Sequence, residues 1–166
     1  MSNTQSIRIS GITPESIVDG AGIRYVIFTQ GCPHHCIGCH NPSTHSFDSG
    51  KVVSLDYILA DIEKNRKYID GITLSGGEPF CQSDQCSIIA EQAQKMGLSV
   101  WCYTGYLFED LYRRGDSLLN YVDILVDGPF DLDKRSLELD FRGSSNQRII
   151  DVRASLEKGV AIMKKF

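Results

Sequence analysis

The sequence has no excess of basic residues, no long apolar run and no leader-like start. Its 17 lysines and arginines are outnumbered by 21 aspartates and glutamates, for a formal net charge of −4, whereas a nucleic-acid-binding domain normally carries a basic face. No apolar run approaches the roughly 20 residues that span a bilayer, and the first residues lack the basic and apolar segments of a signal peptide. We therefore expect a cytoplasmic protein without a nucleic-acid or membrane partner.

Linkers, internal repeats and low-complexity segments are absent as well. A chain of 166 residues, 42% of them hydrophobic and 23% charged, has the size and composition of one globular domain with a core. We expect residues 1–166 to form a single domain.

The main cysteine cluster lacks a fourth cysteine. Cys32, Cys36 and Cys39 form the pattern C-x-x-x-C-x-x-C, while the other three cysteines are scattered. In a reducing compartment, clustered thiols are more often metal ligands than disulfide partners. Three thiolates can hold an iron–sulfur cluster and leave one iron free to bind a small molecule. An iron–sulfur site is therefore the favoured prediction.

Structural zinc is the competing interpretation of the same cysteines. One of the histidines at positions 34, 35, 40 and 45 would complete a Cys₃His set, which is an ordinary closed zinc site. Structural zinc motifs usually combine C-x-x-C with a distant second pair of ligands, however, and here the three cysteines stand alone after a predicted strand. A zinc-stabilised binding module without catalysis remains the alternative from another functional class.

Strands and helices alternate along the predicted fold. Runs of β-branched and aromatic residues predict strands, and apolar residues at helical spacing predict helices, the first with Ser54 as its N-cap. The predicted strands are residues 23–29, 71–74, 98–103, 121–126 and 147–152, and the predicted helices are residues 55–67, 84–96 and 107–114. Such β-α-β units indicate a parallel sheet with its chemistry at the carboxyl ends of the strands. Because a closed eight-stranded barrel takes about 250 residues, we expect an α/β fold that is an open, shortened, partial (β/α) barrel.

A second motif, Ser75-Gly76-Gly77-Glu78-Pro79, follows the second predicted strand. Paired glycines let a ligand approach the backbone closely, and the Glu78 side chain can accept charge-assisted hydrogen bonds from an ammonium group. Taken alone, the motif is a weak signal, because a plain strand-to-helix turn has the same residues.

Together the two motifs resemble the signature of the radical S-adenosylmethionine superfamily. The resemblance implies a partial barrel of that type, with a 4Fe–4S cluster held by Cys32, Cys36 and Cys39. It also implies an S-adenosylmethionine site that includes Gly76, Gly77 and Glu78. In this superfamily the cluster and a radical derived from the cofactor carry the chemistry, so no acid or base side chain is assigned as catalytic.

Further runs narrow the resemblance to the glycyl-radical activating enzymes. Residues 19–24 (D-G-A-G-I-R) are similar to the lead-in motif of those enzymes, with Ala21 in place of the usual proline. Four other runs are similar to the activating proteins of anaerobic ribonucleoside-triphosphate reductases: residues 41–44, 103–106, 126–130 and 141–148. The resemblance implies that the chain forms a glycyl radical on the reductase by reductive cleavage of S-adenosylmethionine. It also implies an external one-electron donor such as flavodoxin or ferredoxin.

One position departs from the superfamily pattern. The residue before the third cysteine is often aromatic and lies against the adenine of the cofactor, but here it is Gly38. His40 can supply a planar face instead, and the backbone from Gly38 through Cys39 to His40 is expected to border the adenine. The resemblance also assigns Thr104 to the cofactor site.

A compact radical enzyme that acts on a small molecule, such as a deazaguanine-forming synthase, is the rival within the same chemistry. Such an enzyme is expected to show extra polar residues for its substrate. The short open barrel favours a protein substrate, because its wide side can receive a loop from a partner that completes the enclosure of a radical.

Overall fold

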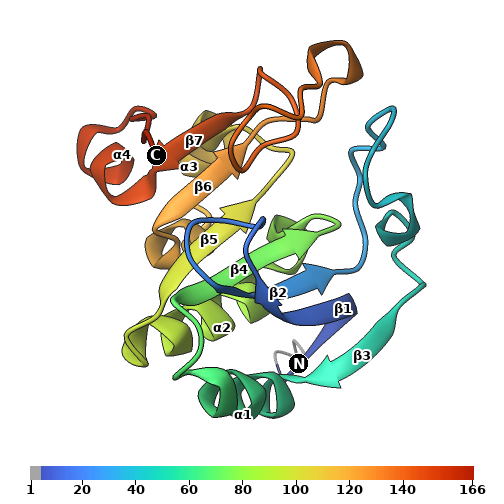
Figure 1. Ribbon diagram of the computed structural model, residues 1–166, viewed down its shortest axis with the longest axis vertical. Coiled ribbons are helices and arrows are strands. Elements are labelled where there is room, and N and C mark those ends of the chain that lie inside the picture. Colours follow the sequence, from blue (N-terminus) through green and yellow to red (C-terminus); the bar gives the residue numbers. More distant parts are fainter. Residues whose placement is uncertain (1–4) are drawn as a thin grey trace.

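A computed structural model describes residues 5–166 and is organised around one sheet (Figure 1). Within these residues seven strands lie in the order β3-β1-β2-β4-β5-β6-β7. The strands are β1 (Ser6–Ser16), β2 (Arg24–Thr29), β3 (Lys51–Ser54), β4 (Gly71–Gly76), β5 (Ser99–Tyr103), β6 (Ile124–Asp127) and β7 (Arg148–Asp151). The helices are α1 (Leu55–Asn65), α2 (Ser83–Lys95), α3 (Phe108–Arg114) and α4 (Val152–Lys158). None of the helices in residues 5–166 combines the length and the apolar character needed to cross a bilayer.

The centre of the sheet is parallel and its flanks are antiparallel. β2, β4, β5 and β6 pair in parallel, whereas β1 and β3 at one flank and β7 at the other are antiparallel to their neighbours. The predicted α/β fold with an open partial barrel is confirmed, but a parallel direction for the last strand is wrong. Parallel neighbours need a crossover connection, usually a helix. Between β6 and β7 the chain forms only a short 3₁₀ helix, Leu132–Lys134, and therefore returns antiparallel.

Two strands at the N-terminal flank were not predicted. β1 has two register shifts against β2, and such irregularities interrupt the alternation of side chains by which a strand is recognised. β3 has only four residues and ends at Ser54, whose hydroxyl accepts a hydrogen bond from the backbone nitrogen of Tyr57 at 3.1 Å. The predicted N-cap of α1 is therefore confirmed.

The strand predicted over residues 121–126 begins later, at Ile124. Asp116 caps a 3₁₀ helix, Ser117–Tyr121, which takes up the first residue of the predicted strand, and Val122 and Asp123 connect this helix to β6. β4, by contrast, continues beyond the predicted residue 74, because Thr29 and Gly76 are still paired. The glycine motif therefore begins inside the sheet.

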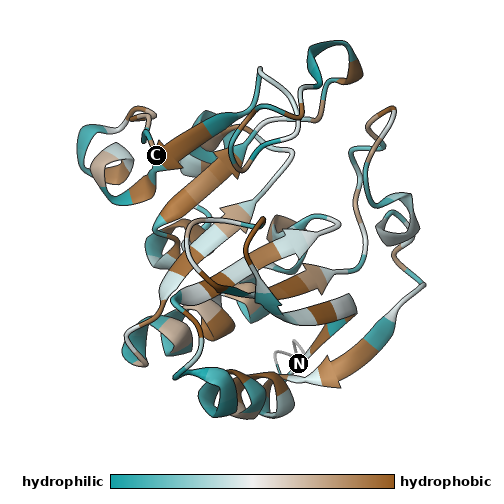
Figure 2. Cartoon of the chain, in the orientation of Figure 1, coloured by the Kyte–Doolittle hydropathy of each residue, from teal (hydrophilic) through white to brown (hydrophobic). Residues whose placement is uncertain are grey.

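Hydrophobic residues recur along the central strands (Figure 2), and their buried side chains form two clusters. The larger core cluster joins the sheet to α1, α2 and α3. A smaller cluster of Trp101, Ile124 and Val126 has Tyr103 and Phe141 packed against it. Its members alternate along β5 and β6 with residues of the larger cluster, so they face the other side of the sheet. This smaller cluster gives that side an apolar floor.

The lead-in motif at residues 19–24 ties the chain before β2 to the neighbouring strands. The guanidinium of Arg24 is buried and donates to the carbonyl of Ile72 at 2.5 Å and to the hydroxyl of Ser99 at 2.7 Å. Burial lowers the pKa of Arg24 to about 10. Gly20 has a φ of +132°, and a Cβ on it would lie 2.9 Å from the ring of Trp101. The motif thus holds its loop against the apolar floor.

Candidate functional site

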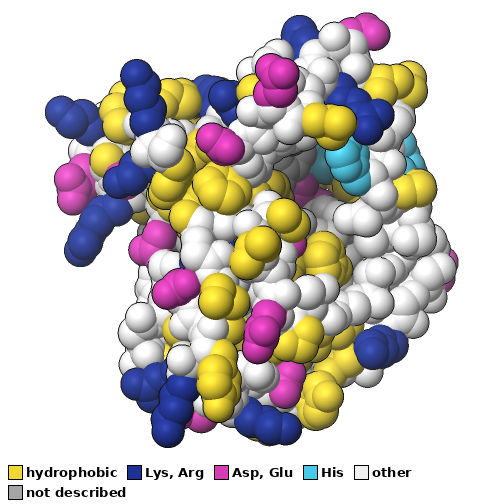
Figure 3. Space-filling view, in the orientation of Figure 1, with side chains coloured by type: hydrophobic (Ala, Val, Ile, Leu, Met, Phe, Trp, Pro, Cys, Tyr) yellow, Lys and Arg dark blue, Asp and Glu magenta, His cyan; other side chains and the backbone are white. Residues whose placement is uncertain are grey.

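The loops that follow β2, β4, β5 and β6 meet at one edge of the sheet and line two adjoining cavities. The carboxyl ends of parallel strands lie side by side, which is why segments far apart in sequence share this edge. The smaller cavity has a volume of about 130 Å³ and the larger of about 360 Å³. Figure 3 shows a hollow on this face, with histidine side chains beside it.

All three clustered cysteines line the smaller cavity. Cys32 is buried, Cys36 and Cys39 are half-buried, and all three are free thiols. The base of their loop is fastened by the backbone nitrogen of Gly31, which donates to the carbonyl of Thr44 at 2.8 Å. Burial raises the pKa of Cys32 to about 11. The Cys32 thiol therefore keeps its proton near neutral pH, and binding of a metal would release it.

The groups around the smaller cavity fit an iron–sulfur cluster. No aspartate or glutamate lines it, so soft sulfur donors take the place of the oxygen donors that hard cations require. His34 and His45 line it too. Within residues 5–166 no three potential ligands are already gathered closely enough to hold a metal ion. The three thiols therefore line one cavity, but they are not close enough together to hold a metal ion in this arrangement.

Gly76 and Gly77 bring the loop after β4 against the backbone of the cysteine loop. Gly76 has a φ of +98°, and a Cβ on it would lie 2.5 Å from the backbone nitrogen of Thr29. A Cβ on Gly77 would lie 2.4 Å from the carbonyl of Gly31, which also accepts a hydrogen bond from the backbone nitrogen of Glu78 at 2.8 Å. These glycines permit a close backbone approach, although the neighbour is protein. Both glycines also line the smaller cavity, where a cofactor could reach them. Their contact with a cofactor stays a prediction.

Glu78 is fully buried and binds three different loops. Its Oε2 accepts a hydrogen bond from the backbone nitrogen of Gly105 at 2.9 Å and lies 2.7 Å from Nε2 of His34. Its Oε1 accepts from the hydroxyl of Thr104 at 2.9 Å and from the backbone nitrogen of Phe80 at 3.1 Å. A carboxylate offers about four lone-pair positions, and these donors use that capacity. The geometry gives Glu78 a positioning role, and its predicted contact with an ammonium group stays untested.

His34, which sequence reasoning named only as one of four possible zinc ligands, lies in the site beside Glu78. Besides its contact with Glu78, its ring meets the ring of Tyr106 edge-on, with centroids 4.5 Å apart. A Cβ on Gly105 would lie 2.5 Å from the His34 ring, so glycine at 105 leaves room for it. A histidine between the first two cysteines was visible in the sequence. Its partners, which lie in the segments after β4 and β5, were not.

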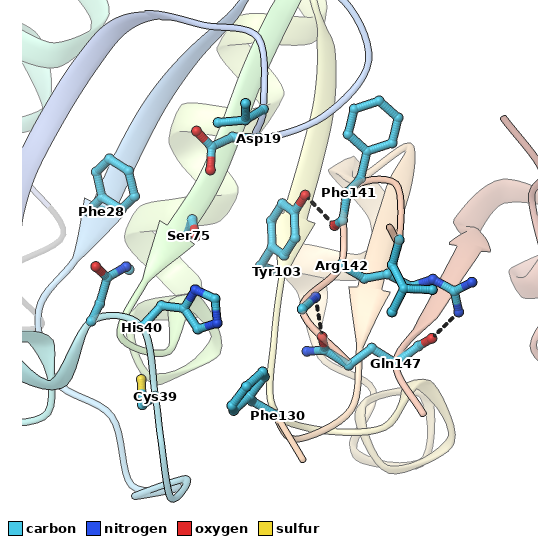
Figure 4. Close-up of a pocket in the computed structure, with 15 residues that line it drawn as sticks. Asp19, Phe28, Cys39, His40, Ser75, Tyr103, Phe130, Phe141, Arg142 and Gln147 are labelled. Atoms are coloured by element: carbon cyan, nitrogen blue, oxygen red, sulfur yellow. Dashed lines mark hydrogen bonds between the residues drawn. The ribbon is translucent and has the colours of Figure 1, made fainter. Parts of the chain in front are cut away.

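The larger cavity, whose lining residues are drawn in Figure 4, adjoins the smaller one and is open to the surface. Six residues line both cavities: Cys39, Ser75, Gly76, Tyr103, Phe130 and Gln147. The hydroxyl of Tyr103 donates to the carbonyl of Phe141 at 2.7 Å, and burial raises the pKa of Tyr103 well above its ordinary value. Phe141 has a φ of +57°, in the left-handed region that phenylalanine rarely adopts. The Tyr103 hydrogen bond helps to hold it there, at the cavity wall.

The run at residues 141–148 fastens the long loop between β6 and β7. Oε1 of Gln147 accepts from the backbone nitrogen of Gly143 at 2.9 Å, and its Nε2 donates to the carbonyl of Gly128 at 3.1 Å. The amide of Asn146 donates to the carbonyl of Pro129 at 2.8 Å. These bonds hold the loop against the segment after β6, and the loop forms one wall of the larger cavity.

The two arginines of this run also serve the fold. Nη1 of Arg142 donates to the carbonyl of Gln147 at 2.8 Å. Nε of Arg148 donates to buried Asp127 at 2.9 Å, and its Nη1 donates to Glu109 at 3.0 Å. The hydrogen bond with Asp127 and, after it, the one with Glu109 raise the pKa of Arg148 above its ordinary value. Arg148 therefore connects β7 to β6 and α3 through its side-chain hydrogen bonds.

The structure separates the residues that were expected to border adenine. His40 is exposed, lines the larger cavity and has its ring centroid 5.0 Å from that of Phe130. Gly38 lines neither cavity, and a Cβ on it would lie 2.9 Å from the side chain of Leu132. Thr104 lines the smaller cavity and donates to Glu78. Phe130, which sequence reasoning listed only within a motif, lines both cavities.

Several known proteins are similar to this chain. A family described as "4Fe-4S single cluster domain" matches residues 18–150. The chain is 37% identical over 147 residues to the anaerobic ribonucleoside-triphosphate reductase-activating protein of Salmonella typhi, a match that covers 84% of this chain and 96% of that protein. Proteins of the same name from Escherichia coli K12 and Enterobacteria phage T4 are each 35% identical, covering 84% and 83% of this chain and 96% and 90% of theirs. Among solved structures, QueE from Escherichia coli is 19% identical with a TM-score of 0.48, covering 60% of this chain and 53% of that one.

Proposed function

The chain belongs to the family of anaerobic ribonucleoside-triphosphate reductase-activating proteins, and from this membership we propose that it activates such a reductase by generating a glycyl radical on it. It is a radical S-adenosylmethionine enzyme whose cofactors are a 4Fe–4S cluster and S-adenosylmethionine. One observation carries the proposal: the three clustered cysteines and the Gly76-Gly77 turn line one cavity, which joins a larger open one.

Cys32, Cys36 and Cys39 are the residues we assign to the cluster, and Gly76, Gly77 and Thr104 border the space beside it. A cluster held by these cysteines would supply the electron for reductive cleavage of S-adenosylmethionine, and that cleavage would provide the radical chemistry that removes a hydrogen atom from the substrate glycine. No side chain of this protein needs to act as an acid or a base in that chemistry.

The task of the protein is therefore positional. Reacting atoms must lie about 3–3.5 Å apart, and other hydrogen donors must be kept away. Glu78 supports the first requirement, because it locks the cysteine loop to the ends of β4 and β5. The burial of Cys32 is in line with the second, because it shows that water has little access to the cavity wall at this cysteine.

The larger cavity suits a protein substrate. Its lining combines apolar side chains, among them Phe28 and Phe141, with the polar side chains of Asp19 and Arg142. Because it is open, a loop that carries the substrate glycine can enter from a partner and complete the enclosure. The reductase is therefore the proposed partner.

The electron donor is external in this proposal. A small one-electron carrier such as flavodoxin or ferredoxin would reduce the cluster, and the cytoplasm is the proposed location, because free thiols such as those of Cys32, Cys36 and Cys39 persist in a reducing compartment.

Electron paramagnetic resonance on an anaerobic mixture tests the function directly. The reconstituted protein is reduced in the presence of S-adenosylmethionine and an anaerobic ribonucleoside-triphosphate reductase. We expect a glycyl radical doublet together with 5′-deoxyadenosine, and neither product when Cys36 is replaced by alanine. A reductase whose radical-bearing glycine is changed to alanine is the matched control, and it should give no doublet.

Two results would contradict the proposal. Formation of 5′-deoxyadenosine without any doublet would point to a small-molecule substrate. A colourless preparation that binds one zinc, in place of about four irons, would point to a structural metal site.

A further inference from the structure

Phe130 stands where the two cavities join. Among the six residues that line both, Phe130 and Tyr103 are the aromatic ones. Tyr103 is engaged elsewhere, since its hydroxyl donates to Phe141 and its ring packs on the cluster around Trp101. Phe130 is half-buried and projects beside Cys39 and the cavity space (Figure 4). It is therefore the aromatic surface that a ligand reaching from one cavity into the other would meet.

Two residues, Gly143 and His40, flank the Phe130 ring and limit the positions it can take. A Cβ on Gly143 would lie 3.1 Å from both Cδ2 and Cε2 of the ring, so the absent side chain leaves room for it. The ring of His40 meets it edge-on, with centroids 5.0 Å apart and an angle of 80° between the planes. A ring restrained before binding has little rotamer freedom left to lose when a ligand packs against it.

The neighbouring cysteine loop has no aromatic side chain of its own at position 38. Gly38 has a φ of +75°, which disfavours any larger residue, and a Cβ there would lie 2.9 Å from Leu132. Leu132 and Phe130 lie two residues apart after β6. The segment after β6 therefore occupies the space beside Gly38 and supplies the apolar surface at this junction.

We propose that Phe130, with His40 beside it, forms the surface against which the adenine of S-adenosylmethionine packs. The proposal rests on the proposed function, because it requires that cofactor to span the two cavities. Adenine is a flat ring that stacks well on aromatic side chains. The methionine end lies toward the three cysteines, and the larger cavity holds the adenosyl end.

Calorimetry with two probes on the cluster-reconstituted protein tests the assignment. S-adenosylhomocysteine carries adenine and methionine does not. We expect Phe130→Ala to weaken binding of S-adenosylhomocysteine about 10-fold and to leave methionine binding unchanged. Phe130→Tyr, which keeps the ring, should stay within about twofold of the unaltered protein. Tyr57→Ala on α1 is the matched control, since Tyr57 is an exposed aromatic residue that lines neither cavity.

The outcomes separate this assignment from the proposed function. Unchanged binding of S-adenosylhomocysteine to Phe130→Ala overturns the assignment, and so does an equal loss of both probes, which would mean that Phe130 only shapes its loop. If Phe130→Ala loses its cluster, Phe130→Leu keeps the apolar volume without a ring, and the same comparison is made with it. Failure of the unaltered, cluster-loaded protein to bind either probe would overturn the proposed function instead.

Discussion

Two buried carboxyl groups stand at the site edge of the sheet, Glu78 just after β4 and Asp127 at the end of β6. Both are fully buried. The donors around Glu78 are a hydroxyl, two backbone nitrogens and the ring of His34. Asp127 is paired with a guanidinium, that of Arg148, and also accepts from the backbone nitrogen of Phe108 at 2.8 Å. Burial of a carboxylate is costly without such partners, and the two regions meet that need differently.

The difference concerns what each carboxyl group holds together. Glu78 connects the cysteine loop to the ends of β4 and β5, so its neighbours form the wall of the smaller cavity. Asp127, through Arg148, connects β6 to β7 and α3, where none of the clustered cysteines lies. One carboxyl group therefore supports the site and the other supports the fold.

The largest expected effect tests whether the Glu78 region is the metal-binding region. Cys36→Ala should abolish retention of the 4Fe–4S cluster and reductive cleavage of S-adenosylmethionine, because two thiols cannot replace three ligands. Cys102→Ala is the matched control, since Cys102 is buried within β5 and should leave the cluster in place. Iron and sulfide content with the visible absorbance measure the first effect, and assay of 5′-deoxyadenosine measures the second. Retained cleavage by the Cys36 variant would refute the site assignment.

Glu78→Gln should cost both stability and cluster retention. Each carboxyl oxygen accepts from a backbone nitrogen, Oε1 from Phe80 and Oε2 from Gly105, so a glutamine must point its NH₂ group at one of these donors. We expect the free energy of unfolding to fall by about 3 kcal/mol, with a clear loss of iron per chain. Denaturant unfolding of the cluster-free protein and iron analysis after reconstitution measure the two effects. A variant that loses stability yet keeps its full iron content would show that Glu78 supports only the fold.

Asp127→Asn provides the opposite half of the comparison. Its amide group must face either Arg148 or the backbone nitrogen of Phe108, both of which are donors. We expect the free energy of unfolding to fall by about 2 kcal/mol, while the iron content after reconstitution stays that of the unaltered protein. The same two measurements apply. Loss of iron in proportion to loss of stability would erase the distinction between the two regions.

The smallest effect concerns Glu109, the second partner of Arg148. Hydrogen bonding from Arg148 lowers the pKa of Glu109 below its ordinary 4.5. A carboxyl group with a lowered pKa in the folded state contributes stability that is present above its unfolded-state pKa and is lost as the pH falls through the folded-state value. Because the Glu109 side chain is about half exposed to solvent, Glu109→Gln should lower the free energy of unfolding at pH 7 by only about 0.5 kcal/mol. Denaturant unfolding at pH 7 and at progressively lower pH should show this difference shrink in acid, and a difference that does not shrink as the pH falls would contradict the electrostatic origin.

The motifs at the site were predictable because each is written in consecutive residues. Each motif follows a strand whose apolar run is readable in the sequence. The motifs are the cysteine pattern of Cys32, Cys36 and Cys39 and the turn through Gly76 and Gly77. Parallel strands then bring their carboxyl ends to one edge. Ser54 as the start of α1 was predictable for the same local reason.

The sequence by itself therefore determined the α/β class and the family resemblance, and it supplied the prediction of which residues hold the cluster. The tertiary structure decided the antiparallel return of β7, the protein partners of Glu78 and the place of Phe130 at the junction of the cavities. The physical reason is the range of the interactions. Turns, caps and ligand spacing depend on neighbours along the chain, whereas the partners of a buried carboxyl group or an aromatic ring are set by strand order and by loops that meet only after folding.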